Sequence, residues 1–128
     1  MNLIEIKHFW SKQIADAKLN VPANLHNYKT LTVTIHNASW CPDCEREVSQ
    51  LLALDAQAEH GFDSITVHSY EDIEDYKKRK IAGALVVTCL PTLIFYQEGQ
   101  EVLRVEEDSA GQLSSQLCQL QNSALTRE

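Results

Sequence analysis

Two cysteines separated by two residues carry the clearest chemistry in this sequence. Residues 40–44 read Trp-Cys-Pro-Asp-Cys, so Cys41 and Cys44 stand three positions apart with a proline between them. At this spacing the two thiols can close a small disulfide ring and open it again. The thiolate form of cysteine both attacks disulfides and binds metals. The pair is therefore a candidate for thiol–disulfide exchange or for half of a zinc site.

The flanking sequence predicts a strand that runs into the cysteine pair and a helix that begins at it. Residues 31–36 are mainly β-branched and apolar, which is typical of a strand. A helix is expected from Pro42 to about His60, because proline suits the first helical position. Cys41 would then lie at the helix N-terminus, where free N–H groups and the helix dipole favour a thiolate. We expect Cys41 to be the exposed, attacking thiol and Cys44 to resolve the mixed disulfide.

The zinc alternative needs more ligands than the motif supplies. A structural zinc ion takes about four ligands, and the sequence contains no second C-x-x-C and no H-x-x-x-H pattern. Redox chemistry is therefore the favoured interpretation of Cys41 and Cys44, with no metal and no other cofactor expected.

The rest of the chain predicts an α/β domain. Apolar periodicity and turn residues predict a helix, strand, helix, strand, helix, two strands and a last helix. Their approximate ranges are 2–18, 31–36, 42–60, 64–68, 71–80, 92–96, 101–105 and 109–122. Gly61 is the expected stop of the second helix, and residues 97–100 are the expected hairpin turn. Strands joined through a helix should be parallel, so we expect a mixed four-stranded sheet with helices on both faces.

Composition limits the function classes. The chain has 128 residues, enough for one domain with its own core, and a net charge of −7. The acidic balance argues against nucleic-acid binding. No apolar run approaches the roughly 18 residues of a membrane span, and the N-terminus lacks the pattern of a secretory signal. With four cysteines and no visible signal, a reducing cytoplasm is the expected location.

Taken together, these motifs resemble the thioredoxin family. The similarity lies in residues 40–44, in 90–96 (L-P-T-L-I-F-Y) and in 99–102 (G-Q-E-V), and it covers about residues 31–122. The resemblance implies a single thioredoxin-like domain over residues 1–128. It also implies a cis Leu90–Pro91 bond facing the dithiol, with Leu90 ready to pair with an extended substrate. Trp40, Pro42, Asp43, Leu90 and Pro91 are then the expected substrate-contacting residues.

The chain departs from the family at several positions. Thioredoxins usually carry Gly-Pro between the two cysteines, where this chain has Pro-Asp. The family keeps a buried aspartate six residues before the first cysteine, where this chain has Ile35. The lysine that accompanies that aspartate aligns near His68. Because the family aspartate helps to deprotonate the resolving cysteine, Cys44 would need another proton acceptor, and Asp43 and His68 are the candidates from sequence.

Three functional hypotheses follow from these residues and motifs. The first is an oxidoreductase that reduces protein or small-molecule disulfides as a monomer and is regenerated by a reductase or by glutathione. The second is a thioredoxin-fold binding module in which the dithiol is regulatory or incidental. The third is a metal or iron–sulfur carrier that uses the pair and Cys89, which the sequence leaves open as either an inert buried thiol or an exposed third thiol.

Overall fold

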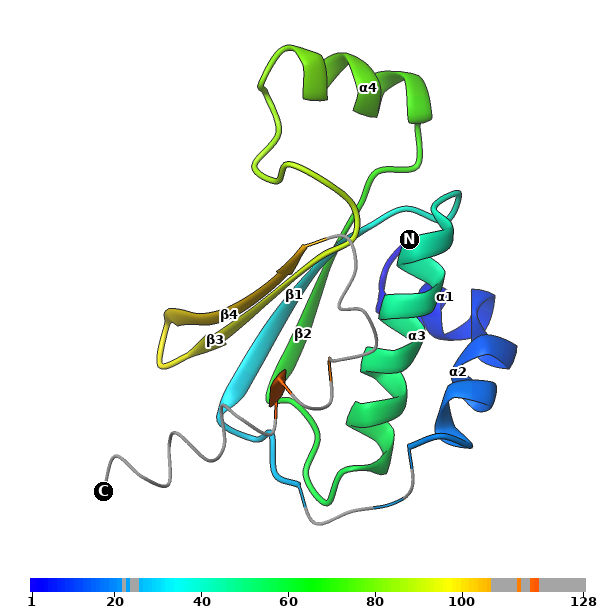
Figure 1. The fold of residues 1–128 in the computed structure, drawn as a ribbon, viewed down its shortest axis with the longest axis vertical. Coiled ribbons are helices and arrows are strands. Elements are labelled where there is room, and N and C mark those ends of the chain that lie inside the picture. The colour runs from blue at the N-terminus through cyan, green and yellow to red at the C-terminus, as the bar shows by residue number, and fades with distance from the viewer. Residues whose placement is uncertain (22, 24–25, 107–112, 114–115, 118–128) are drawn as a thin grey trace.

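A four-stranded mixed sheet forms the centre of the computed structural model (Figure 1). The structure describes residues 1–21, 23, 26–106, 113, 116 and 117. The strands are β1 (Leu31–Asn37), β2 (Ser64–Ser69), β3 (Thr92–Gln97) and β4 (Gln100–Glu106), in the order β2-β1-β3-β4. β1 is parallel to β2 and antiparallel to β3, and β3 is antiparallel to β4. The predicted α/β class with a mixed four-stranded sheet is confirmed.

The hairpin between β3 and β4 follows from its two-residue turn. Glu98 and Gly99 both have positive φ angles, 53° and 78°. Turns of this kind match the right-handed twist of the two strands, and glycine adopts the required backbone conformation at no steric cost. The predicted turn at residues 97–100 and both predicted strands are therefore confirmed, each strand being slightly longer than predicted.

Helix α3 (Pro42–Gln57) carries the second cysteine and covers one face of the sheet. Its buried side includes Val48, Leu51 and Leu52, which join the core with Val33 and Ile35 of β1. Alternate residues of β1 face this core because side chains alternate along a strand. This packing of α3 on β1 places the first turn of the helix beside the end of the strand.

The end of α3 differs from the prediction. The helix ends at Gln57 rather than near His60, so Gly61 is not its stop. Gly61 instead makes room for Asp55, because a Cβ there would lie 2.4 Å from Asp55 Oδ1. That oxygen accepts the N–H of Phe62 at 2.7 Å, so Gly61 allows the chain to turn from α3 toward β2.

The N-terminal helical region is two helices rather than the single one predicted over 2–18. They are α1 (Leu3–Phe9) and α2 (Ser11–Lys18), separated at Trp10, whose ψ of 27° lies outside the helical range. Backbone hydrogen bonds still run from Trp10 N–H to Ile6 and from Ile14 N–H to Trp10. The periodic apolar face is therefore buried as predicted, but across a kink that neither proline nor glycine marks in the sequence.

Helix α4 (Ile73–Ile81) stands beyond the end of the sheet, whereas α1, α2 and α3 lie together on one side of it (Figure 1). Among the described residues, the predicted placement of helices on both faces of the sheet is therefore not observed. Asp72 caps α4 by accepting the N–H of Asp75 at 3.0 Å. The acidic start and basic end are those predicted, and they suit the helix dipole. Tyr76 is its buried residue.

The predicted last helix, residues 109–122 with Cys118, lies mostly outside the described residues. Leu113 and Leu117 are described, and both are fully buried in the core. Among the described residues, no helix is both long enough and apolar enough to cross a bilayer.

Candidate functional site

The dithiol occupies the junction between β1 and α3. Cys41 is the N-cap of α3, and its Sγ accepts a hydrogen bond from the backbone N–H of Cys44 at 3.3 Å. Pro42 follows in the first turn, where its missing N–H leaves no unmet donor. Both thiols are free. The helix N-terminus and the Cys44 N–H thus both face the Cys41 sulfur, which is the position predicted from the sequence.

The two sulfurs differ in their access to solvent. The prediction that Cys41 is exposed is wrong, because Cys41 is buried with 8% of its surface exposed. Cys44 is fully buried, so Cys41 is still the more accessible of the two thiols. Burial, together with the hydrogen bond to Cys41, raises the pKa of the Cys44 thiol far above its ordinary value. The neighbouring Asp43 raises it further. Cys44 is therefore a protonated thiol that lies behind Cys41, away from solvent.

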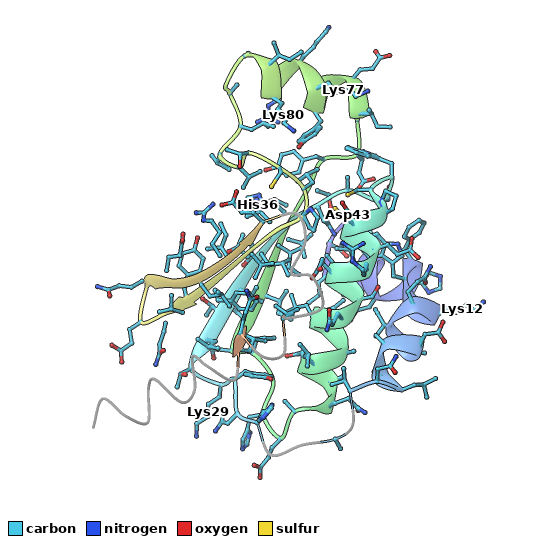
Figure 2. All side chains as sticks on the ribbon, viewed as in Figure 1. Lys12, Lys29, His36, Asp43, Lys77 and Lys80 are labelled. Atoms are coloured by element: carbon cyan, nitrogen blue, oxygen red, sulfur yellow. The ribbon has the colours of Figure 1, made fainter. Side chains whose placement is uncertain are left out.

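Asp43, at the start of α3 (Figure 2), forms an ion pair with a residue of the same helix. Arg46 donates from Nη1 to Asp43 Oδ1 at 3.0 Å, and both side chains are substantially exposed. Asp43 is thus a charged side chain beside the dithiol, and its carboxylate is directed at Arg46.

The predicted proline motif at residues 90–96 lies beside the cysteine pair. The Leu90–Pro91 peptide bond is cis, and the Cys41 thiol donates to the carbonyl oxygen of Leu90 at 3.8 Å. Leu90 and Pro91 are themselves buried. The fold therefore brings together two segments 49 residues apart, and it sets a backbone edge beside the more accessible sulfur.

An aromatic cluster holds Trp40 beside the dithiol. The Trp40 indole N–H donates to the Tyr70 carbonyl at 2.9 Å, and its ring lies 5.6 Å from that of Tyr76 in α4. Burial, and then the nearby sulfurs of Cys89, Cys41 and Cys44, raise the pKa of the Tyr76 hydroxyl. Tyr76 thus joins α4 to the site, a role that its place in a charged helical segment did not signal.

Glu71 is a second residue that sequence reasoning missed. Both of its carboxylate oxygens accept the backbone N–H of Ser39 at 3.3 Å, and one also accepts the Ser39 hydroxyl. Ser39 directly precedes Trp40, so Glu71 fixes the loop that leads into the dithiol. In the sequence it looks like part of a solvated acidic turn, and only the fold brings it to Ser39.

Ile35 and His68 lie on opposite faces of the sheet. Ile35 is fully buried on the face toward α3. His68 pairs in register with His36, and their rings stack 4.9 Å apart on the other face. His68 is therefore poorly placed to take a proton from Cys44, which corrects its candidacy.

His36 predicts a pH-dependent stability. Burial, and then the charges of His68 and Arg104, lower the pKa of His36 to about 4. In the unfolded chain a histidine titrates near pH 6.5. The stability that comes from the low pKa of His36 in the folded state is therefore fully present above about pH 6.5 and is lost as the pH falls toward 4. Between pH 7 and 5, the wild type should lose about 1–2 kcal/mol more unfolding free energy than His36→Gln.

Urea titration at the two pH values measures this difference. His8→Gln is the matched control, because His8 is exposed in α1. Equal pH dependence in the wild type, His36→Gln and His8→Gln would show that His36 titrates normally.

Cys89 lies two residues before Pro91 and is half-buried. Its sulfur is 3.9 Å from Thr92 Oγ1 and 3.9 Å from Glu106 Oε2. No group of three or more His, Cys, Asp or Glu side chains that could hold a metal ion occurs among the described residues.

Comparison with known proteins found similar folds among solved structures. Thioredoxin O1 from Arabidopsis thaliana is 22% identical over 85% of this chain and 86% of its own, with a TM-score of 0.47. Trxlp from Edwardsiella tarda is 22% identical over 80% of this chain and 88% of its own, with a TM-score of 0.45. A Pseudomonas aeruginosa protein of unknown function is 17% identical over 91% and 76%, with a TM-score of 0.49. No family model and no curated protein matches.

Proposed function

We propose that this chain is a thioredoxin-like dithiol–disulfide oxidoreductase that reduces disulfides of proteins or small molecules. The position of the Cys41 sulfur carries the proposal. It lies 3.3 Å from the Cys44 N–H at a helix N-terminus and 3.8 Å from the Leu90 carbonyl, beside a cis proline. The more accessible of the two sulfurs thus has a fully buried partner thiol behind it and a backbone edge beside it.

Each step of the proposed reaction has a defined thiol. The Cys41 thiolate attacks one sulfur of the substrate disulfide, the substrate S–S bond breaks, and the leaving thiolate takes a proton. Cys44 then loses its proton and attacks Cys41, which releases the second substrate thiol. The substrate has gained two electrons and two protons, and the protein holds a Cys41–Cys44 disulfide. A reductase or glutathione returns the dithiol by the reverse exchange.

The substrate surface of this proposal surrounds Cys41. Trp40 and Pro42 flank the sulfur in sequence, and Leu90 and Pro91 lie across from it. An extended substrate segment can run beside Leu90 in the manner of an added strand. Asp43 lies at the edge, where its charge selects against acidic groups close to the sulfur. We take the protein to act as a cytoplasmic monomer on these substrates.

Insulin reduction tests the proposal. With dithiothreitol as the electron source, the wild type should accelerate precipitation of the insulin chains, and Cys41→Ser should not. Cys89→Ser is the matched control, since it also removes one thiol near the site but leaves the pair intact.

The competing hypothesis, a binding module with an incidental dithiol, predicts a different result. In that case neither insulin nor hydroxyethyl disulfide is reduced faster than by dithiothreitol alone. A wild type that behaves like Cys41→Ser with both disulfides would therefore contradict the proposed activity.

A further inference from the structure

Helix α4 carries the densest positive charge in an acidic protein. Lys77, Lys78, Arg79 and Lys80 are consecutive and exposed, and they are four of the eleven basic residues in a chain of net charge −7. Arg79 lies 3.9 Å from Asp75 in the same helix. The acidic residues of α4 are confined to its first turn, so the last turn keeps a local excess of positive charge.

A contact between an ammonium group and a ring, and then one between two rings, link the positive turn of α4 to the dithiol. The Lys80 ammonium lies 5.8 Å from the centre of the Tyr76 ring, and the Tyr76 ring lies 5.6 Å from that of Trp40. Trp40 directly precedes Cys41. Figure 2 shows Lys77 and Lys80 on α4, with Asp43 at the nearby start of α3. The positive turn therefore borders the approach to Cys41.

Exposed apolar side chains lie next to the same turn. Ile81, the last residue of α4, is 89% exposed. Val86, in the segment that links α4 to Leu90, is 80% exposed. We call residues 77–86 the basic arm. A surface that combines positive charge with large exposed apolar side chains is typical of an interaction site.

We propose that the basic arm docks an acidic segment of the protein whose disulfide Cys41 attacks. This proposal rests on the proposed function and adds a substrate class to it. The remaining chain is strongly acidic and repels an acidic protein, so attraction at the arm orients such a partner with its disulfide toward Cys41. Ile81 and Val86 add apolar contact to that attraction.

A short acidic protein segment fits the arm better than a nucleic acid does. The positive run spans about one helical turn, and the acidic first turn of the same helix borders it. A long polyanion would have to cross Glu74 and Asp75. An acidic segment of a few residues needs only the last turn and can place its apolar side chains on Ile81 and Val86.

Matched charge variants test the proposal. The arm variant is Lys77→Gln/Lys78→Gln/Lys80→Gln. The control variant is Lys12→Gln/Lys18→Gln/Lys29→Gln, which removes the same charge elsewhere; Figure 2 shows Lys12 and Lys29 far from α4. Stopped-flow reduction would compare two cyclic disulfide peptides that differ only in acidic or basic flanking residues, with hydroxyethyl disulfide as a neutral reference.

We expect the arm variant to reduce the acidic peptide about tenfold more slowly than the wild type at low salt. The control variant should change less than twofold, and high salt should remove the difference because it screens exposed charges. Both variants should reduce the neutral disulfide as the wild type does. Lys77→Glu/Lys78→Glu, which keeps the contact of Lys80 with Tyr76, should give a loss at least as large.

Equal loss in the arm and control variants would overturn the proposal, because it would show an effect of net charge alone. Tighter binding of a single-stranded oligonucleotide than of the acidic peptide would overturn it as well. Fluorescence anisotropy of the acidic peptide, reduced and with its thiols alkylated, measures binding to the protein without disulfide exchange. If the wild type reduces nothing but binds this peptide better than the arm variant does, the proposed activity fails and the docking surface stands.

Discussion

Replacing Cys41 with serine is expected to abolish disulfide reduction, whereas replacing Cys44 is expected to stop the reaction after its first step. The two variants differ because the two thiols have different surroundings. Cys41 is the more accessible sulfur and lies at the helix N-terminus. Cys44 is fully buried, and burial raises its pKa far above the ordinary value. Only Cys41 can therefore begin the exchange.

The aromatic disulfide dithiobis(nitrobenzoate) reports both steps in one experiment. Attack by Cys41 releases one coloured thionitrobenzoate, and attack by Cys44 on the resulting mixed disulfide releases a second. A background without Cys89 and Cys118 removes colour from thiols outside the pair. In it the wild-type pair should release two equivalents and Cys44→Ser one, while Cys41→Ser should react at least about a hundredfold more slowly.

Mass spectrometry gives an independent check of the same prediction. Cys44→Ser should carry the mass of one thionitrobenzoate on the peptide that contains Cys41. One equivalent released by Cys41→Ser as fast as by the wild-type pair would assign the attacking role to Cys44. A stable adduct on Cys44 in the wild type would reverse the two roles.

The parts of the site that could be predicted from sequence are those encoded by local patterns. β-Branched and apolar residues predicted β1, and the C-x-x-C motif with its proline predicted the start of α3. The hairpin followed from Gly99, whose positive φ the turn requires. The contact between Cys41 and Leu90 was expected from the family resemblance alone, because no local pattern places a distant proline segment beside a helix N-terminus.

The parts that could not be predicted depend on packing between distant elements. Glu71 and Tyr76 belong to a charged segment with ordinary helical signals, yet one fixes Ser39 and the other supports Trp40. The kink at Trp10 and the early end of α3 carry no breaker residue at the break itself. Strand alternation predicts that Ile35 and His36 face opposite ways, but the register with β2 is needed to put His68 with His36.

The pairing of His68 with His36 leaves Cys44 without the histidine that the sequence suggested as its proton acceptor. The resemblance to thioredoxin implies an acid at position 35, where this chain has Ile35, and His68 lies on the other face of the sheet. A raised pKa makes the thiolate of Cys44 scarce near neutral pH. Attack by Cys44 on the mixed disulfide should therefore be the slow step of reduction in this protein.

Ile35→Asp is expected to speed this second step about tenfold or more near pH 7, since a positioned carboxylate can accept the Cys44 proton. The same change should lower the free energy of unfolding by about 3–5 kcal/mol, because it removes a buried apolar side chain and buries a carboxyl group. Ile35→Asn is the matched control. It has a similar size and polarity and a comparable loss of stability, but it offers no proton acceptor.

The release of the second thionitrobenzoate, followed after the first is complete, isolates the step. Acceleration in Ile35→Asp but not in Ile35→Asn would identify proton removal from Cys44 as the barrier. Equal acceleration in both would instead indicate that a loosened core gives Cys44 freer access to Cys41. If Ile35→Asp leaves the rate unchanged and His68→Ala lowers it tenfold, proton transfer must pass through the far face of the sheet. The stacking of His68 on His36, away from α3, argues for the first outcome.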